Sequence, residues 1–182
     1  MVVWCLEHGA TFDLVDRRKR GEPILERVAA SGDIQTFDLL RSKGAPLGER
    51  VLHRAVEAAT FGKPDPANAE KDTEYQRKER ISHIKCMHMV RHLLHEVHLD
   101  VNAPDQPEGS NFPDCKGPPI CYIASYAGIE RDTRELTWLL LDQGADPKAG
   151  LEEARLMEYP KLAEDIKAWK AKQSRWGKCC VQ

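Results

Sequence analysis

The feature that most constrains the fold of this chain is a helical pattern that recurs and ends each time in the dipeptide Gly-Ala. Leucines precede the dipeptide in each copy, and they are consecutive in the second and third copies. Glycine is the usual residue at a helix end, because it adopts the left-handed backbone conformation there without steric cost. A recurring helix end predicts an all-α chain of repeated units, each too small to bury a core alone. The three dipeptides begin at Gly9, Gly44 and Gly144.

A second pattern precedes these endings. Three segments begin at a glycine and become small and apolar eight or so residues later, around Ala29, Ala55 and Ala124. We expect small side chains to let the first helix of each unit lie close to its neighbours, while leucines of the second helix fill the layer between units. The three segments are residues 21–32, 48–59 and 117–128.

Together these patterns resemble the ankyrin repeat, in which G-x-T-P-L-H-x-A-A-x-x-G is followed by a second helix ending in Leu-Leu and Gly-Ala-Asp. His53 stands at the family's histidine, and residues 114–117 keep its D-x-x-G lead-in. The threonine and proline of the signature are mostly replaced. The resemblance covers roughly residues 2–170. It implies an all-α, ankyrin-type helical repeat solenoid with irregular finger loops and a long inter-helix insertion.

The resemblance divides the chain into a repeat array over residues 1–172 and a flexible tail over residues 173–182. The first unit lacks its first helix, so either the array is part of a longer one or its apolar strip contacts a partner. Within the array we expect a partial unit at 1–20, full units at about 21–47, 48–103 and 114–147, an insertion at 60–80, and a divergent cap at 150–172.

In the resembled family, partner proteins dock against the finger loops and the groove lined by the first helices. The resemblance therefore implies a protein–protein interaction module or scaffold whose partner is another protein. Tyr126 is the expected anchor, because aromatic side chains dominate interface hot spots. The expected partner-binding positions are Lys19, Arg20, Glu22, Ser31, Glu49, Glu57, Cys115, Lys116, Pro118 and Tyr126.

A cluster of histidines suggests an alternative function. His88, His92 and His95 are spaced i, i+4, i+7, which places three imidazoles on one stripe of a helix. Such a stripe could bind zinc, and with the 60–80 insertion it could form the pocket of an enzyme or enzyme subunit. The histidines do not follow the H-E-x-x-H order, so we favour solvated histidines and expect no catalytic residue, metal or cofactor. The residues expected on the buried face of this helix are Met89, Val90 and Leu93.

Charge and cysteine content bear on partners and location. The net charge of −2 and the pI near 6.4 argue against a nucleic-acid partner. The six cysteines form no C-x-x-C pair, and no apolar run is long enough to span a membrane. These features predict reduced thiols and a cytoplasmic location. A nuclear location stays open, because the basic run 17–20 fits a localisation signal as well as a solvated finger.

The last four residues, 179–182, fit the C-a-a-X form of a prenylation signal on Cys179, with Gln182 as a residue associated with farnesyl. Cys180 replaces the first aliphatic position, and the alternative is a chance match. A basic stretch lies upstream, and stable anchoring needs such a second signal in addition to one lipid chain. A lipid on Cys179 would attach the chain peripherally to a membrane.

Overall fold

The computed structural model describes residues 5, 8–12, 23–61, 74–106, 115–126 and 131–179, without the side chains of residues 75, 76, 126 and 175–179. Every regular element within these residues is a helix, which confirms the predicted all-α class. The elements are α2 (Ile24–Ser31), α3 (Ile34–Ser42), α4 (Val51–Thr60), α5 (Glu74–His95), the 3-10 helix η3 (Pro119–Tyr126), α6 (Arg134–Asp142), α7 (Pro147–Leu156) and α8 (Pro160–Cys179).

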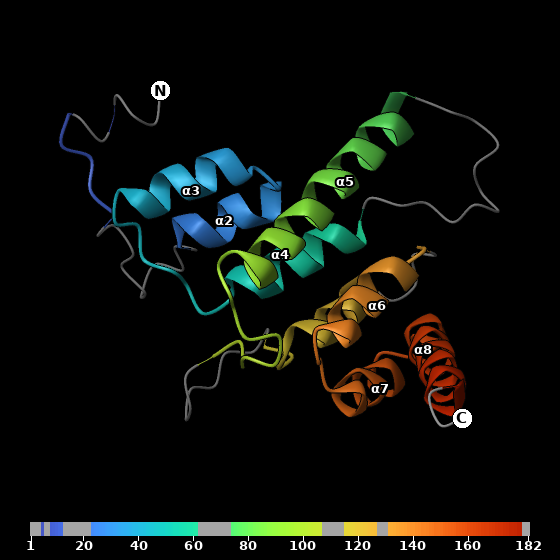
Figure 1. The fold of residues 1–182 in the computed structure, drawn as a ribbon. Coiled ribbons are helices and arrows are strands. Elements are labelled where there is room, and N and C mark those ends of the chain that lie inside the picture. Colours follow the sequence, from blue (N-terminus) through green and yellow to red (C-terminus); the bar gives the residue numbers. More distant parts are fainter. Residues whose placement is uncertain are drawn as a thin grey trace.

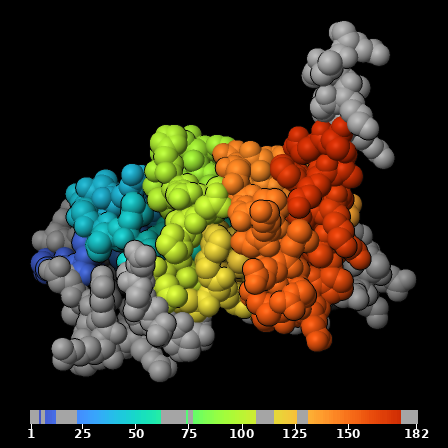
Figure 2. All heavy atoms as spheres, turned by 90° about the horizontal axis from the view of Figure 1, so that it is seen from below, coloured from blue at the N-terminus to red at the C-terminus, as the bar shows by residue number. Residues whose placement is uncertain are grey.

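The described helices pack as consecutive pairs: α2 with α3, α4 with α5, η3 with α6, and α7 with α8 (Figure 1). The first helices of successive pairs also contact one another, α2 against α4, α4 against η3, and η3 against α7. In the space-filling view the colours pass from blue to red along the molecule, so the pairs lie in chain order (Figure 2). Each pair therefore lies next to the pairs that precede and follow it in sequence.

One continuous core runs through these pairs from Leu25 to Ile166. The three alanines expected between neighbouring first helices, Ala29, Ala55 and Ala124, are fully buried. Because an alanine side chain is a single methyl group, the backbones of α2, α4 and η3 approach closely at these points. The leucines of the second helices fill the layers between the pairs. The buried leucines of these layers are Leu40, Leu93, Leu94, Leu140 and Leu141.

The predicted Gly-Ala endings form one recurring hydrogen-bonded turn. The amide of the alanine donates to the carbonyl five residues earlier at 3.0 Å in all three copies. The glycines have φ angles of 87°, 90° and 91°, in the left-handed region that favours glycine. The recurrence in the sequence is therefore also a recurrence in backbone geometry. The three turns are Cys5–Ala10, Leu40–Ala45 and Leu140–Ala145.

The sequence places short acids, which can cap a helix, at two of the described helix starts. The Asp33 carboxylate accepts a hydrogen bond from the Thr36 amide at 3.0 Å and caps α3. Asp146 caps α7 in the same way, by accepting from the Lys148 amide at 2.9 Å. Asp114, the third such residue of the pattern, lies outside the described residues.

Two elements differ from a regular repeat. Helix α5 is 22 residues long and begins at Glu74, within the predicted 60–80 insertion; residues 62–73 of that insertion lie outside the described part. The first helix of the third pair, η3, is a 3-10 helix. None of the helices that the structure describes combines the length and the apolar character needed to cross a bilayer.

Candidate functional site

The first helix of the second pair places a histidine beneath the loop that joins α5 to η3. We call this loop (residues 96–118, of which 107–114 lie outside the description) the α5–η3 finger. The His53 side chain is fully buried, and its Nε2–H donates to the Ala103 carbonyl in the finger at 3.1 Å. Its ring lies edge-on to the Tyr122 ring, with centroids 5.2 Å apart. Helix α4 therefore fixes the finger through one imidazole.

A buried carboxylate closes the same finger. Asp105 is 3% exposed, and its Oδ2 accepts hydrogen bonds from the Lys116 amide at 2.6 Å and the Gly117 amide at 3.1 Å. The Tyr122 hydroxyl donates to the same oxygen at 2.7 Å. Because a buried charge is costly unless several donors satisfy it, these three bonds hold Asp105 to the last residues of the finger and to η3.

The finger is also linked to the next pair. The Asn102 side chain donates from Nδ2 to the Gly144 carbonyl at 2.9 Å, and its Oδ1 accepts from the Asp146 backbone amide at 2.8 Å. On the other side, the Lys116 ammonium lies 3.5 Å from a carboxylate oxygen of Glu153 on α7. The α5–η3 finger is therefore anchored to three successive pairs.

Burial and hydrogen bonds together determine the protonation states of this cluster. Burial lowers the pKa of His53 to about 4, against the carbonyl of Ala103 and the charge of Asp105, which raise it. Burial by itself would raise the pKa of Asp105, but the hydrogen bonds from Tyr122, Gly117 and Lys116 lower it below the usual value. Burial also raises the pKa of Tyr122, and the bond to Asp105 adds to that shift. At neutral pH the cluster thus contains a neutral imidazole, a carboxylate and a neutral phenol.

This protonation pattern suits a structural role. The neutral His53 imidazole has a single N–H, and that N–H donates to the Ala103 carbonyl of the finger. Burial raises the pKa of Cys121 to about 12, so this buried neighbour of Tyr122 stays a thiol. Neither sulfur nor phenol is activated as a nucleophile. The arrangement can hold the described parts of the finger, residues 96–106 and 115–118, in a defined shape.

The structure brings some of the predicted partner-binding residues together. Cys115, Lys116 and Pro118 lie half-buried on the α5–η3 finger, while Ser31 and Glu49 are exposed on other pairs. Glu57 is partly buried and forms an ion pair with Arg54 on α4. Four of the predicted positions lie outside the description, either entirely or by their side chains. These are Lys19, Arg20, Glu22 and Tyr126, the last of which ends η3.

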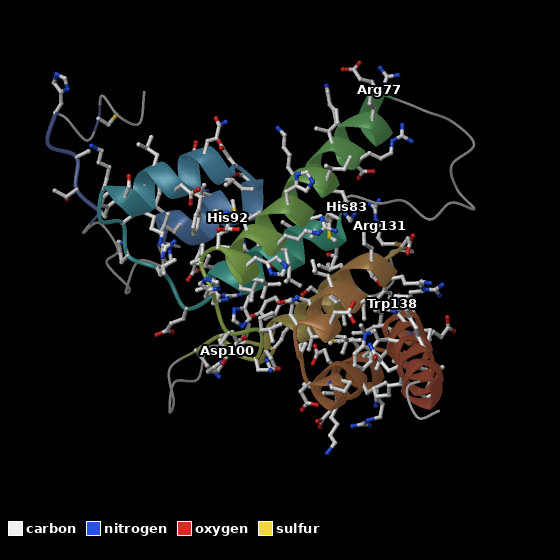
Figure 3. The ribbon with its side chains drawn as sticks, viewed as in Figure 1. Arg77, His83, His92, Asp100, Arg131 and Trp138 are labelled. Carbon is white, nitrogen blue, oxygen red and sulfur yellow. The ribbon has the colours of Figure 1, made fainter. Side chains whose placement is uncertain are left out.

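The histidines of α5 do not converge. His88 and His95 are exposed, as expected of solvated histidines, whereas the His92 Nε2–H donates to Asp38 on α3 at 2.8 Å (Figure 3). The predicted buried residues Met89, Val90 and Leu93 are buried. Within the described part of the chain, no three side chains of the metal-binding types gather around one point.

Two further residues of α5 have a role that the sequence did not indicate. The His83 Nδ1–H donates to the Ala59 carbonyl in the last turn of α4 at 2.7 Å, and His83 is labelled in Figure 3. The Cys86 thiol donates to the Ala30 carbonyl in the last turn of α2 at 3.6 Å. Carbonyls at helix ends lack partners within their own helix. Helix α5 therefore supplies side chains that satisfy the ends of two first helices.

The sequence interpretation missed Asp105, Tyr122 and His83. Ala103, Pro104 and Asp105 have the composition of a turn, but the three donors to Asp105 come from residues 11 to 17 positions later. Tyr122 stood in an apolar segment and was indistinguishable from an ordinary core residue. The spacing of residues in the sequence does not reveal a buried carboxylate, because the packing of the helical pairs determines which donors lie next to it.

Cys179 is the last described residue of α8, and its side chain is not described. Lipidation at this residue stays a prediction.

No protein-family model, no curated protein and no solved structure matches this chain.

Proposed function

We propose that this chain is an ankyrin-type helical repeat array whose function is to bind another protein. The observation that carries the proposal is the recurring turn, with the same hydrogen bond at 3.0 Å and the same glycine conformation in three copies. Contacts between successive first helices, in chain order, support the same architecture. Stacked helical pairs of this kind present an extended surface made of loops and first helices, which suits them to protein partners.

The anchored finger supports a binding role in a second way. A loop held by His53, Asp105 and Asn102 loses little conformational entropy when a partner docks on it. Loops positioned on a rigid scaffold commonly carry function. We place the partner contact on this finger and on the exposed predicted positions of the neighbouring pairs, Ser31 and Glu49.

The test is affinity capture of a partner from the source cell, followed by binding measurements with that partner and purified variants. We expect Glu49→Arg to weaken binding at least tenfold, because a reversed charge at the contact repels what the glutamate attracts. Tyr126→Ala should weaken it at least tenfold as well, through loss of the anchor. Circular dichroism of each variant should match that of the parent chain.

The matched control is Glu74→Arg, which makes the same charge reversal at an exposed glutamate in the first turn of α5, outside the finger and the first helices. Binding by this variant should stay within twofold of the parent. Equal loss in Glu49→Arg and Glu74→Arg, or unchanged binding by both Glu49→Arg and Tyr126→Ala, would refute the proposed surface.

A further inference from the structure

The last helix continues past the part that packs against the rest of the molecule. In its first half, Leu162, Asp165 and Ile166 are fully buried. The Trp169 indole N–H then donates to Asp142 at 2.7 Å, and the Lys172 ammonium lies 4.8 Å from the centroid of the Trp138 ring. Beyond Trp169, each described side chain from Lys170 to Ser174 is exposed. The docked half therefore fixes the direction of a helix whose second half faces solvent, at the edge of the molecule (Figure 2).

The exposed half is strongly basic. We call residues 167–179 of α8 the basic end. It contains five lysines and arginines and no aspartate or glutamate. Because the whole chain has a net charge of −2 and the basic end has +5, the remaining residues carry −7. The basic residues of this segment are Lys167, Lys170, Lys172, Arg175 and Lys178.

Among the described side chains, two of these charges form no ion pair with the rest of the molecule. Lys161, at the start of α8, lies 3.5 Å from Asp165, and Lys172 faces the Trp138 ring. In contrast, Lys167 and Lys170 are exposed and form no ion pair with any described residue. Basic residues do stabilise the carboxyl end of a helix, but that effect fades within its last turn. Lys167 lies twelve residues before Cys179, too far for this explanation.

We propose that the basic end of α8 binds the surface of a membrane that contains anionic phospholipids. A chain of negative net charge can bind such a surface, because salt screens charges beyond about 8 Å at physiological ionic strength. The basic residues nearest the membrane therefore determine the attraction. Basic helices carrying tryptophan are typical of the membrane interface, and the sequence places Trp176 within the basic end. Nucleic acid is the less favoured partner, because its binding domains are usually basic throughout, whereas this chain has a pI near 6.4.

The basic end of α8 is distinct from the finger that we propose as the protein contact. An experiment can therefore contradict the membrane proposal without contradicting the proposed function. The experiment is co-sedimentation of the full chain, made in bacteria and therefore without a lipid on Cys179, with vesicles. One vesicle set is pure phosphatidylcholine, and the other contains about 30% phosphatidylserine, comparable to an anionic leaflet. We expect binding to the second set only, and loss of binding at about 0.5 M salt, where the Debye length falls to a few Å.

The test variant is the double substitution Lys167→Gln, Lys170→Gln, which keeps good helix formers at exposed positions. We expect it to weaken vesicle binding about thirtyfold, since each basic residue near such a surface contributes about fivefold. The matched control is Lys43→Gln, Lys148→Gln, which removes two exposed lysines elsewhere and should change binding less than twofold.

Three results would overturn the proposal. The first is equal binding to both vesicle sets, and the second is an unchanged affinity in the Lys167→Gln, Lys170→Gln variant. The third is tighter, equally lysine-dependent binding to duplex DNA or RNA than to the anionic vesicles, which would assign the basic end to nucleic acid.

Discussion

The buried imidazole of His53 makes the finger sensitive to acid. In the folded chain its Nε2–H is held by the Ala103 carbonyl, and a second proton on the ring would place a positive charge on a fully buried side chain. The folded pKa is therefore about 4, against 6.5 in the unfolded chain. As pH falls below 6.5, His53 binds a proton in the unfolded chain but not in the folded chain. The contribution of His53 to stability is thus present above pH 6.5 and is lost towards pH 4.

We expect the free energy of unfolding to fall by about 3 kcal/mol through this residue between pH 7 and pH 4, since one pKa unit corresponds to about 1.4 kcal/mol. Urea unfolding at a series of pH values measures it. His53→Gln should be less stable at pH 7 and should show a correspondingly flatter pH dependence. His95→Gln, at an exposed histidine, should keep the slope of the parent chain. Parallel slopes for the parent and His53→Gln would contradict the assignment.

At the scale of the helices, two glycines with similar backbone conformations have different surroundings. Gly32, at the end of α2, has a φ of 72°, and Gly144, after α6, has a φ of 91°. A Cβ on Gly32 would lie 2.8 Å from the Lys85 carbonyl carbon and 2.9 Å from the Cys86 amide nitrogen, both in the backbone of α5. A Cβ on Gly144 would meet nothing within 4 Å. The first glycine therefore allows two helices to approach, and the second only ends a helix.

Substituting alanine at Gly32 and at Gly144 separates the cost of the left-handed backbone from the cost of a clash with α5. Gly144→Ala should lower the free energy of unfolding by about 1 to 2 kcal/mol, the cost of a left-handed alanine. Gly32→Ala should cost about 2 kcal/mol more, because α5 must also shift away from α2. Urea unfolding of the two variants gives the difference directly. Equal losses would show that α5 does not pack against Gly32.

At the scale of the whole molecule, the last pair is joined to the array by a buried carboxylate. Asp165 on α8 is fully buried and accepts from the Arg134 side chain at 2.9 Å and the Thr133 hydroxyl at 3.2 Å. The Trp138 indole N–H donates to the Asp165 carbonyl at 3.0 Å. In a stack of pairs, each pair depends mainly on its neighbours, so the end pair can open while the others stay folded.

Asp165→Asn should loosen α8 by about 2 to 3 kcal/mol, because the charge that holds Arg134 is lost while the site stays buried. Native-state hydrogen exchange should then quicken in α7 and α8 and stay unchanged in α2 and α4. Glu164→Gln, the same change of charge at the adjacent exposed position, should leave exchange as in the parent chain. A uniform increase over all helices would instead mean that the array unfolds as one cooperative unit.

The sequence by itself was sufficient for the all-α class, the Gly-Ala turns, the capping roles of Asp33 and Asp146, and the buried face of α5. These features follow from interactions within a few residues, such as a left-handed glycine, a short acid at a helix start, and apolar spacing along one helix. The finger, in contrast, was predicted only as a set of contact positions, and its anchors were absent from the prediction.

Only the tertiary structure decided which side chains meet. His92 was grouped with other histidines because it shares a helical stripe with them, yet its partner is Asp38, 54 residues away. The donors to Asp105 come from residues 11 to 17 positions later, and His83 donates to the Ala59 carbonyl on another helix, 24 residues away. The spacing of residues along the chain indicates backbone conformation. A buried polar contact depends instead on how neighbouring helical pairs pack, because that packing removes donors and acceptors from water and brings them within hydrogen-bond distance of each other.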